Sequence, residues 1–288
     1  MIFASALTVY IVTIFATIIT IVLNAYILYK KLSSRQFFNN SQLQLQYYCV
    51  FFYWIFAISC LAHATYMCYA LTDPNRSLDL VFWSGTSMNS TEHVVGIGNT
   101  FVAIDRLLAM VSPGKYRKIY GAILHKLYLI CLPAIIVTCV VIYALNKEYR
   151  KPGNSFGLVV NREILVALND FNAGACGCNV LLTVGFMVCF WKFLKRQNRS
   201  INSGQYRNIK KANYVVMYQM LLEIVLVIIP MAITAVFNSF GVNLIEILGP
   251  YPLTVLSLYT ASCSVVYIFK LKRTTEKKPV VTTVRTVI

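Results

Sequence analysis

The stretch GIGNTFVAIDRLLAMVSPGKYRKIY, residues 96–120, ends a long apolar run with two adjacent opposite charges, Asp105 and Arg106. The whole chain has 288 residues, of which 58% are hydrophobic and only 12% are charged. A soluble domain of this length carries about 25% charged residues. The composition therefore predicts an integral membrane protein, and it places the charged pair at the edge of a membrane span.

Seven apolar blocks are long enough to cross a bilayer as helices. They lie at about residues 5–29, 47–71, 79–111, 124–145, 164–192, 213–238 and 247–269. The first block is too long for a signal-peptide core and has no basic segment before it, so we interpret it as a retained span. We predict an all-α membrane protein with a seven-transmembrane helix bundle at residues 1–270 and a short basic cytoplasmic tail at 271–288.

Lys and Arg are distributed unevenly between the connections. Of the 26, twenty lie in the first, third and fifth connections or the tail, five lie on the opposite side, and Arg106 is the last. The positive-inside rule then places the N-terminus outside and the C-terminus in the cytoplasm. Anionic membrane lipids account for the net charge of +16, so no nucleic-acid partner is predicted.

Polar and small residues of the third block recur at helical spacing, on one face about 140° wide. They are Asn89, Glu92, His93, Gly96, Asn99, Thr100, Ala103 and Arg106. Such a face must contact protein or water, which predicts a central position for this span. Helix packing alone explains Gly96, Asn99 and Thr100, whereas Glu92 and His93 lie roughly 20 Å above Arg106, within reach of a ligand from outside.

Six polar residues in the outer half of the spans form the predicted ligand site. They are His63, Glu92, His93, Asn169, Asp170 and Tyr251. A pocket that holds Glu92 and Asp170 favours a cationic or donor-rich ligand when the carboxylates are ionised. A metal site at these residues is disfavoured, the nine cysteines are interpreted as core residues, and no cofactor is predicted.

Asp105 and Arg106 are followed, after Leu107 and five further residues, by Pro113 and then by Tyr116. The pair lies within reach of water at the cytoplasmic end of the third span. The spacing resembles the D-R-Y-x5-P-x-x-Y signature of rhodopsin-like G-protein-coupled receptors. The resemblance implies that Asp105 restrains Arg106 at rest, that an outward swing of the sixth span frees Arg106 to contact a G protein, and that Pro113 opens a docking loop.

Other marks of that superfamily are partial. Asn24 matches its asparagine in the first span, and Pro230 matches the proline that kinks the sixth. Ile228 replaces the expected tryptophan, and of the N-P-x-x-Y motif only Tyr267 is kept. The seventh span contains no lysine, which excludes a retinal-binding pigment.

This mixture resembles the serpentine chemosensory receptors of nematodes, in particular class BC. The resemblance implies a plasma-membrane receptor, including the membrane of a sensory cilium, with a small-molecule ligand outside and a heterotrimeric G protein inside. One alternative is a secondary transporter or channel with a polar path lined by the third span. Another is an intramembrane enzyme that uses Glu92, His93 and Asp170, although neither alternative explains the Asp-Arg signature.

Two short motifs lie outside the spans. Asn75-Arg76-Ser77 is a glycosylation sequon on the predicted outer face. The terminal Thr286-Val287-Ile288 fits capture by a PDZ domain, which adds the peptide to a sheet as a strand.

Overall fold

The computed structural model describes residues 2–33, 41–73, 76–148, 156–197, 204–242 and 244–275. Its α-helices are α1 (Ile2–Ser33), α2 (Ser41–Ala70), α3 (Leu78–Val111), α4 (Pro113–Lys115), α5 (Gly121–Leu145), α6 (Arg162–Gln197), α7 (Gly204–Glu223), α8 (Ile229–Ser239), α9 (Leu244–Leu248) and α10 (Tyr251–Thr275). Shorter turns are the π-helical η2 (Tyr116–Tyr120) and η4 (Ile224–Ile228) and the 3-10 turn η3 (Phe156–Leu158). The sequon at Asn75 and the terminal residues 286–288 lie outside the described residues.

Within the described ranges, seven helical stretches are long and apolar enough to cross a membrane, which confirms the predicted number of spans. They are Ala4–Ser33, Gln44–Ala70, Leu78–Val111, Pro113–Leu145, Arg162–Lys192, Asn213–Phe237 and Tyr251–Phe269. The fourth begins earlier than the hydropathy predicts, because α4 and η2 continue into α5. Pro113 therefore starts a helix instead of opening a loop, since its fixed φ and missing N–H suit the first helical turn.

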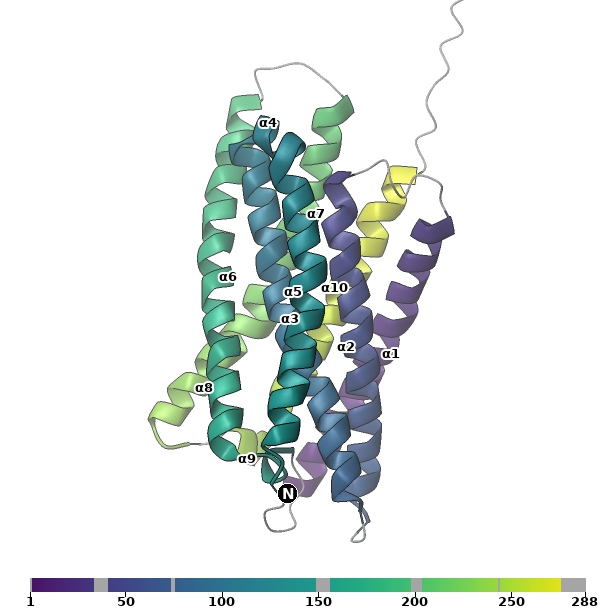
Figure 1. Ribbon diagram of the computed structural model, residues 1–288, viewed down its shortest axis with the longest axis vertical. Coiled ribbons are helices and arrows are strands. Elements are labelled where there is room, and N and C mark those ends of the chain that lie inside the picture. The colour runs from purple at the N-terminus through teal and green to yellow at the C-terminus, as the bar shows by residue number, and fades with distance from the viewer. Residues whose placement is uncertain are drawn as a thin grey trace, which may run out of the picture.

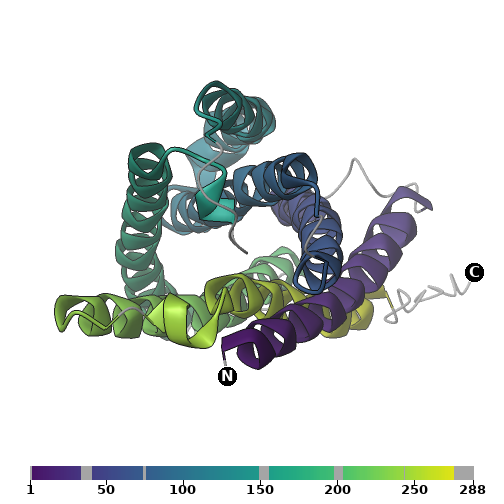
Figure 2. The same cartoon turned by 90° about the horizontal axis from the view of Figure 1, so that it is seen from below.

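The third span has the central position that its polar face predicts. Helix α3 packs against α2, α5 and α6 and also contacts α7, whereas α1 lies on the outside against α2 and α10 (Figures 1 and 2). Its buried residues include Gly96, Asn99, Ala103 and Arg106 from the predicted face. The one helix therefore contacts most of the bundle along its length.

The bundle encloses polar side chains within a largely apolar core, and its outer surface also carries many large apolar side chains. Asn99, Asp105 and Arg106 are buried, whereas Phe15 and Leu181 are 66% and 74% exposed. In a bilayer the exposed apolar side chains contact lipid, and the interior holds the groups that lipid cannot solvate.

The connection between α5 and α6 is anchored on α3. An antiparallel bridge joins Lys147 to Val160, and the backbone N–H of Glu148 donates to the Val159 carbonyl at 3.1 Å. These contacts hold Phe156, which is buried against the backbone of Gly85. A Cβ atom at position 85 would overlap the Phe156 ring, so only glycine fits there.

Gly85→Ala is expected to lower the stability of the folded protein by about 1–3 kcal/mol, the usual effect of overpacking. The measurement is the melting temperature of the purified protein in detergent. Gly174→Ala is the matched control, since nothing lies within 4 Å of a Cβ added at that helical glycine. Equal melting temperatures for the two variants would contradict a tight contact at Gly85.

The sixth span is bent in its middle. Helix α7 ends at Glu223, the π-helical turn η4 follows, and α8 begins one residue before Pro230. Pro230 has no N–H to donate to the preceding turn, which weakens the helix at this point. Figure 1 shows α8 leaning away from the direction of α7, toward the side of α6.

Candidate functional site

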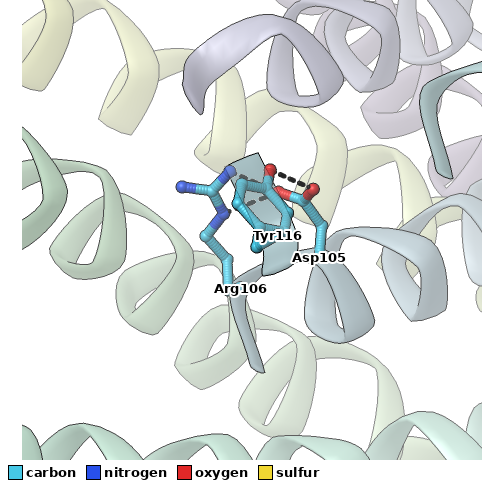
Figure 3. A network of polar contacts seen from close by, with 3 residues as sticks. All are labelled: Asp105, Arg106 and Tyr116. Carbon is cyan, nitrogen blue, oxygen red and sulfur yellow. Dashed lines mark hydrogen bonds and ion pairs between the residues drawn. The ribbon is translucent and has the colours of Figure 1, made fainter. Parts of the chain in front are cut away.

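Asp105, Arg106 and Tyr116 form a compact polar cluster (Figure 3). Arg106 Nε donates to Asp105 Oδ2 at 2.8 Å, and Arg106 Nη2 donates to the same oxygen. Tyr116 donates through its hydroxyl to Asp105 Oδ1 at 2.6 Å. The Asp105 carboxylate is therefore held on both oxygens, one by a guanidinium and the other by a phenol.

The charged pair is buried, which corrects the expectation that it reaches water. Asp105 and Arg106 are each 1% exposed. Helix α3 continues past them to Val111, and the chain then turns at Ser112, where the backbone is no longer helical (φ −137°, ψ 63°). Pro113 starts the next helix from this turn, and Tyr116 is thereby brought back against Asp105.

Tyr116→Phe is expected to reduce stability by about 1.5–3 kcal/mol, the range for a hydrogen bond to a charged group. The reason is that Asp105 Oδ1 loses the donor that the structure gives it. Thermal unfolding of the purified protein measures the effect. Tyr120→Phe is the control because Tyr120 is 37% exposed, and an equal loss in both variants would contradict the account.

A second polar network joins four spans in the middle of the bundle. Gln219 of α7 donates through Nε2 to the Tyr53 hydroxyl at 2.9 Å and to Asn99 Oδ1 at 3.0 Å. Its Oε1 accepts from the Tyr267 hydroxyl at 2.6 Å. Asn99 donates to the Tyr259 hydroxyl at 2.9 Å, and Tyr53 donates to Asn99 Oδ1. Gln219 thus links α7 to α2, α3 and α10.

A cavity lies on the side of this network away from Asp105 and Arg106. It is bounded by α3, α6, the bend of the sixth span and α10. The space between these helices that no atom occupies is about 570 Å³, open solvent at its mouth included. Asn99 and Tyr259 line it and also belong to the network. A molecule in the cavity would therefore contact the side chains that connect the four spans.

Two carboxylates line the cavity, Glu92 from α3 and Glu223 from the end of α7. Asn179 of α6 donates to Glu223 Oε1 at 2.6 Å. Pro230 also lines the cavity, so the bend of the sixth span forms part of its wall. Thr234 and Tyr251, which share a hydrogen bond, line it from α8 and α10.

Comparison with protein families adds to this geometry. Residues 2–147 match the family model of the serpentine type 7TM GPCR chemoreceptor Srbc, and residues 83–277 match that of the serpentine type 7TM GPCR chemoreceptor Srv. The chain belongs to the serpentine seven-transmembrane chemoreceptors. No curated protein matches it significantly. The match confirms the resemblance that the Asp-Arg spacing indicated, and it makes this chain a receptor of the membrane and not an enzyme.

The receptor brings only part of the predicted ligand site together. Glu92 and Tyr251 line the cavity. His63 is buried elsewhere, where its Nδ1 lies 3.0 Å from the Ser84 hydroxyl. Asn169 and Asp170 are exposed on α6 and are not among the residues that line the cavity.

His93 lies one position beyond Glu92 but does not line the cavity. It is 1% exposed, and neither of its ring nitrogens has a hydrogen-bond partner among the described residues. Consecutive residues of a helix are turned by 100°, so neighbours in the sequence need not share an environment. Asn172, one turn before Cys176 on α6, lines the cavity where Asp170 was expected.

Sequence reasoning missed the network around Gln219. An amide inside an apolar run is a signal for contact between helices, and Gln219 stands in such a run. Tyr53 and Tyr259 carry no comparable signal, because the chain has 19 tyrosines. Of the predicted switch residues, Tyr267 is hydrogen-bonded to Gln219 in this network, and Pro230 lines the cavity.

Proposed function

We propose that this receptor binds a small molecule in the cavity and activates a heterotrimeric G protein at the end of the bundle that holds Arg106. The observation that carries the proposal is the sharing of Asn99 and Tyr259 between the cavity and the Gln219 network. The cavity and the Arg106 cluster also share helix α3. A ligand therefore has a short physical route to the groups that hold the sixth span.

The uneven distribution of Lys and Arg supports an orientation with the N-terminus outside and Arg106 toward the cytoplasm. In this orientation the ligand reaches the cavity from outside the cell. The membrane is the plasma membrane, including that of a sensory cilium. Capture of the terminal Thr286-Val287-Ile288 by a PDZ domain stays a prediction.

The proposed chemistry is a shift between two states of the bundle. At rest, Asp105 holds Arg106, Tyr116 holds Asp105, and Gln219 holds the sixth span to its neighbours. A ligand that binds more tightly when α7 has moved draws the population toward that state. The movement breaks the contacts of Gln219 and exposes Arg106 to the G protein. The sixth span is then the element with two states, and the ligand in the cavity shifts the balance between them.

The test is G-protein recruitment in cells that express the full chain, with a proximity reporter and fractionated small-molecule extracts as the stimulus. We expect at least one fraction to cause recruitment by the wild type and none by Arg106→Ala at equal surface expression. Ion or solute flux without recruitment, from well-expressed surface protein, would favour the transporter alternative and contradict the proposal.

A further inference from the structure

Resting on the proposed function, we propose that the ligand of the cavity is a small organic amine that is protonated at neutral pH. Its ammonium group binds the carboxylate of Glu92, and its apolar body fills the rest of the cavity. Two features of the lining support this class of ligand: carboxylates with no cation among the lining residues, and an apolar wall.

Glu92 is the unpaired carboxylate. It lines the cavity with its side chain partly accessible, and in the described ranges no group donates a hydrogen bond to it and no cation pairs with it. An ionised carboxylate inside the membrane is stable only beside a cation or with several donors. A bound ammonium group supplies both, because it carries a positive charge and up to three N–H donors.

The remaining polar lining also accepts hydrogen bonds. Glu223 contributes a second carboxylate, for which the Asn179 amide supplies a neutral donor. Asn172 lines the cavity as well, with an amide that can both accept and donate. The hydroxyls of Thr234 and Tyr251 are hydrogen-bonded to each other. No Lys, Arg or His is among the lining residues of the part of the chain that the structure describes.

The charges of the lining therefore discriminate between ligand classes. When both carboxylates are ionised, they repel an anionic ligand and each other across a space of low dielectric, and a bound cation offsets both repulsions. A carboxylic acid is the least favourable ligand. A neutral alcohol offers one donor and no charge, so it binds more weakly than an amine of the same shape.

The rest of the wall is apolar, so it favours a ligand whose body is apolar. Val95, Val227, Met231, Val255 and Leu256 line it with Pro230 and Pro252. Apolar side chains of this kind favour an aryl or alkyl group beside the ammonium. The predicted ligand is thus an amphiphilic amine and not a polyhydroxylated one.

The experiment measures binding without a G protein. Purified full-length receptor in detergent is melted with three matched probe sets, phenyl, indolyl and linear eight-carbon alkyl, each as amine, alcohol and carboxylic acid. The same sets are applied to Glu92→Gln and to Glu163→Gln, whose exposed side chain lies outside the cavity lining and which changes the charge equally.

We expect the amine of at least one set to raise the melting temperature of the wild type and of Glu163→Gln more than its alcohol or acid does. Its apparent affinity is expected to fall about 30-fold or more in Glu92→Gln, because one partner of a desolvated charge pair is removed. An acid or alcohol that stabilises as well as its amine would overturn the inference, as would no amine effect in any set or an undiminished effect in Glu92→Gln.

The two proposals fail separately. If a non-basic compound activates a G protein and the response requires Arg106, the assignment of an amine is wrong and the proposed function stands. If an amine binds through Glu92 but the occupied receptor activates no G protein, the ligand class stands and the proposed function is wrong. In cells, Glu92→Gln is expected to weaken the potency of the amine.

Discussion

The Arg106→Ala variant is expected to lose ligand-dependent G-protein activation while its cavity still binds ligand. Under the proposed function Arg106 is the side chain that contacts the G protein, so its removal ends coupling without touching the cavity. Recruitment and ligand binding, measured on the same surface-expressed protein, separate the two properties. Retained recruitment would refute the role given to Arg106.

Arg106→Ala is also expected to lower the stability of the receptor, because Asp105 and Arg106 are both buried. Arg106→Ala leaves the Asp105 carboxylate buried with Tyr116 as its remaining donor among the contacts described above. Removing one partner of a buried ion pair costs about 3–5 kcal/mol, so the yield of the variant is expected to fall although it still reaches the membrane. The double variant Asp105→Asn/Arg106→Ala removes the orphaned charge. It should recover stability and remain uncoupled, whereas recovery of coupling would show that instability caused the loss.

Gln219→Leu is expected to increase activation in the absence of ligand and to lower stability by about 2 kcal/mol. Leucine has a similar size but cannot donate to Tyr53 and Asn99 or accept from Tyr267. The buried Tyr267 hydroxyl therefore loses its acceptor, which lowers stability. The contacts of Gln219 hold α7 to α2, α3 and α10, and their loss favours the state in which the sixth span has moved. Recruitment without ligand and the melting temperature measure the two effects.

Gln44→Leu provides the matched control for Gln219. Gln44 donates to the Tyr48 hydroxyl at 2.7 Å, but both residues belong to α2. The same substitution there removes a hydrogen bond within one helix and leaves the contacts between spans unchanged. Raised activation in both variants, or in neither, would contradict a specific role for the Gln219 network.

The sequence predicted the architecture well because the bilayer imposes it. A span requires about 20 apolar residues and an interior position for its ionisable groups, and both requirements are visible in the residues themselves. The central position of the third span followed from Glu92, Asn99 and Arg106 on one face. The early start of the fourth span did not follow, because Lys115 and Lys118 lower the hydropathy of residues that are nevertheless helical.

The site was only partly predictable, because a pocket depends on how helices rotate about their axes. The polarity of Asp170 and His63 shows that they are unusual residues in a span. It does not show in which direction each side chain points. Asp170 is exposed on α6, and His63 pairs with Ser84. Glu92 was predicted near the cavity because its helix is central, and it lines the cavity. The contacts of Gln219 were not predicted, because its partners come from three other spans.

We propose that ligand binding to this receptor activates a G protein through Arg106. The most direct measurement is nucleotide exchange on a purified heterotrimer by the receptor reconstituted in lipid nanodiscs, with and without a fraction that causes recruitment in cells. We expect ligand to speed exchange by the wild type and by Tyr120→Phe, and to have no effect on exchange by Asp105→Asn/Arg106→Ala. Ligand-dependent exchange that persists in the double variant would contradict it.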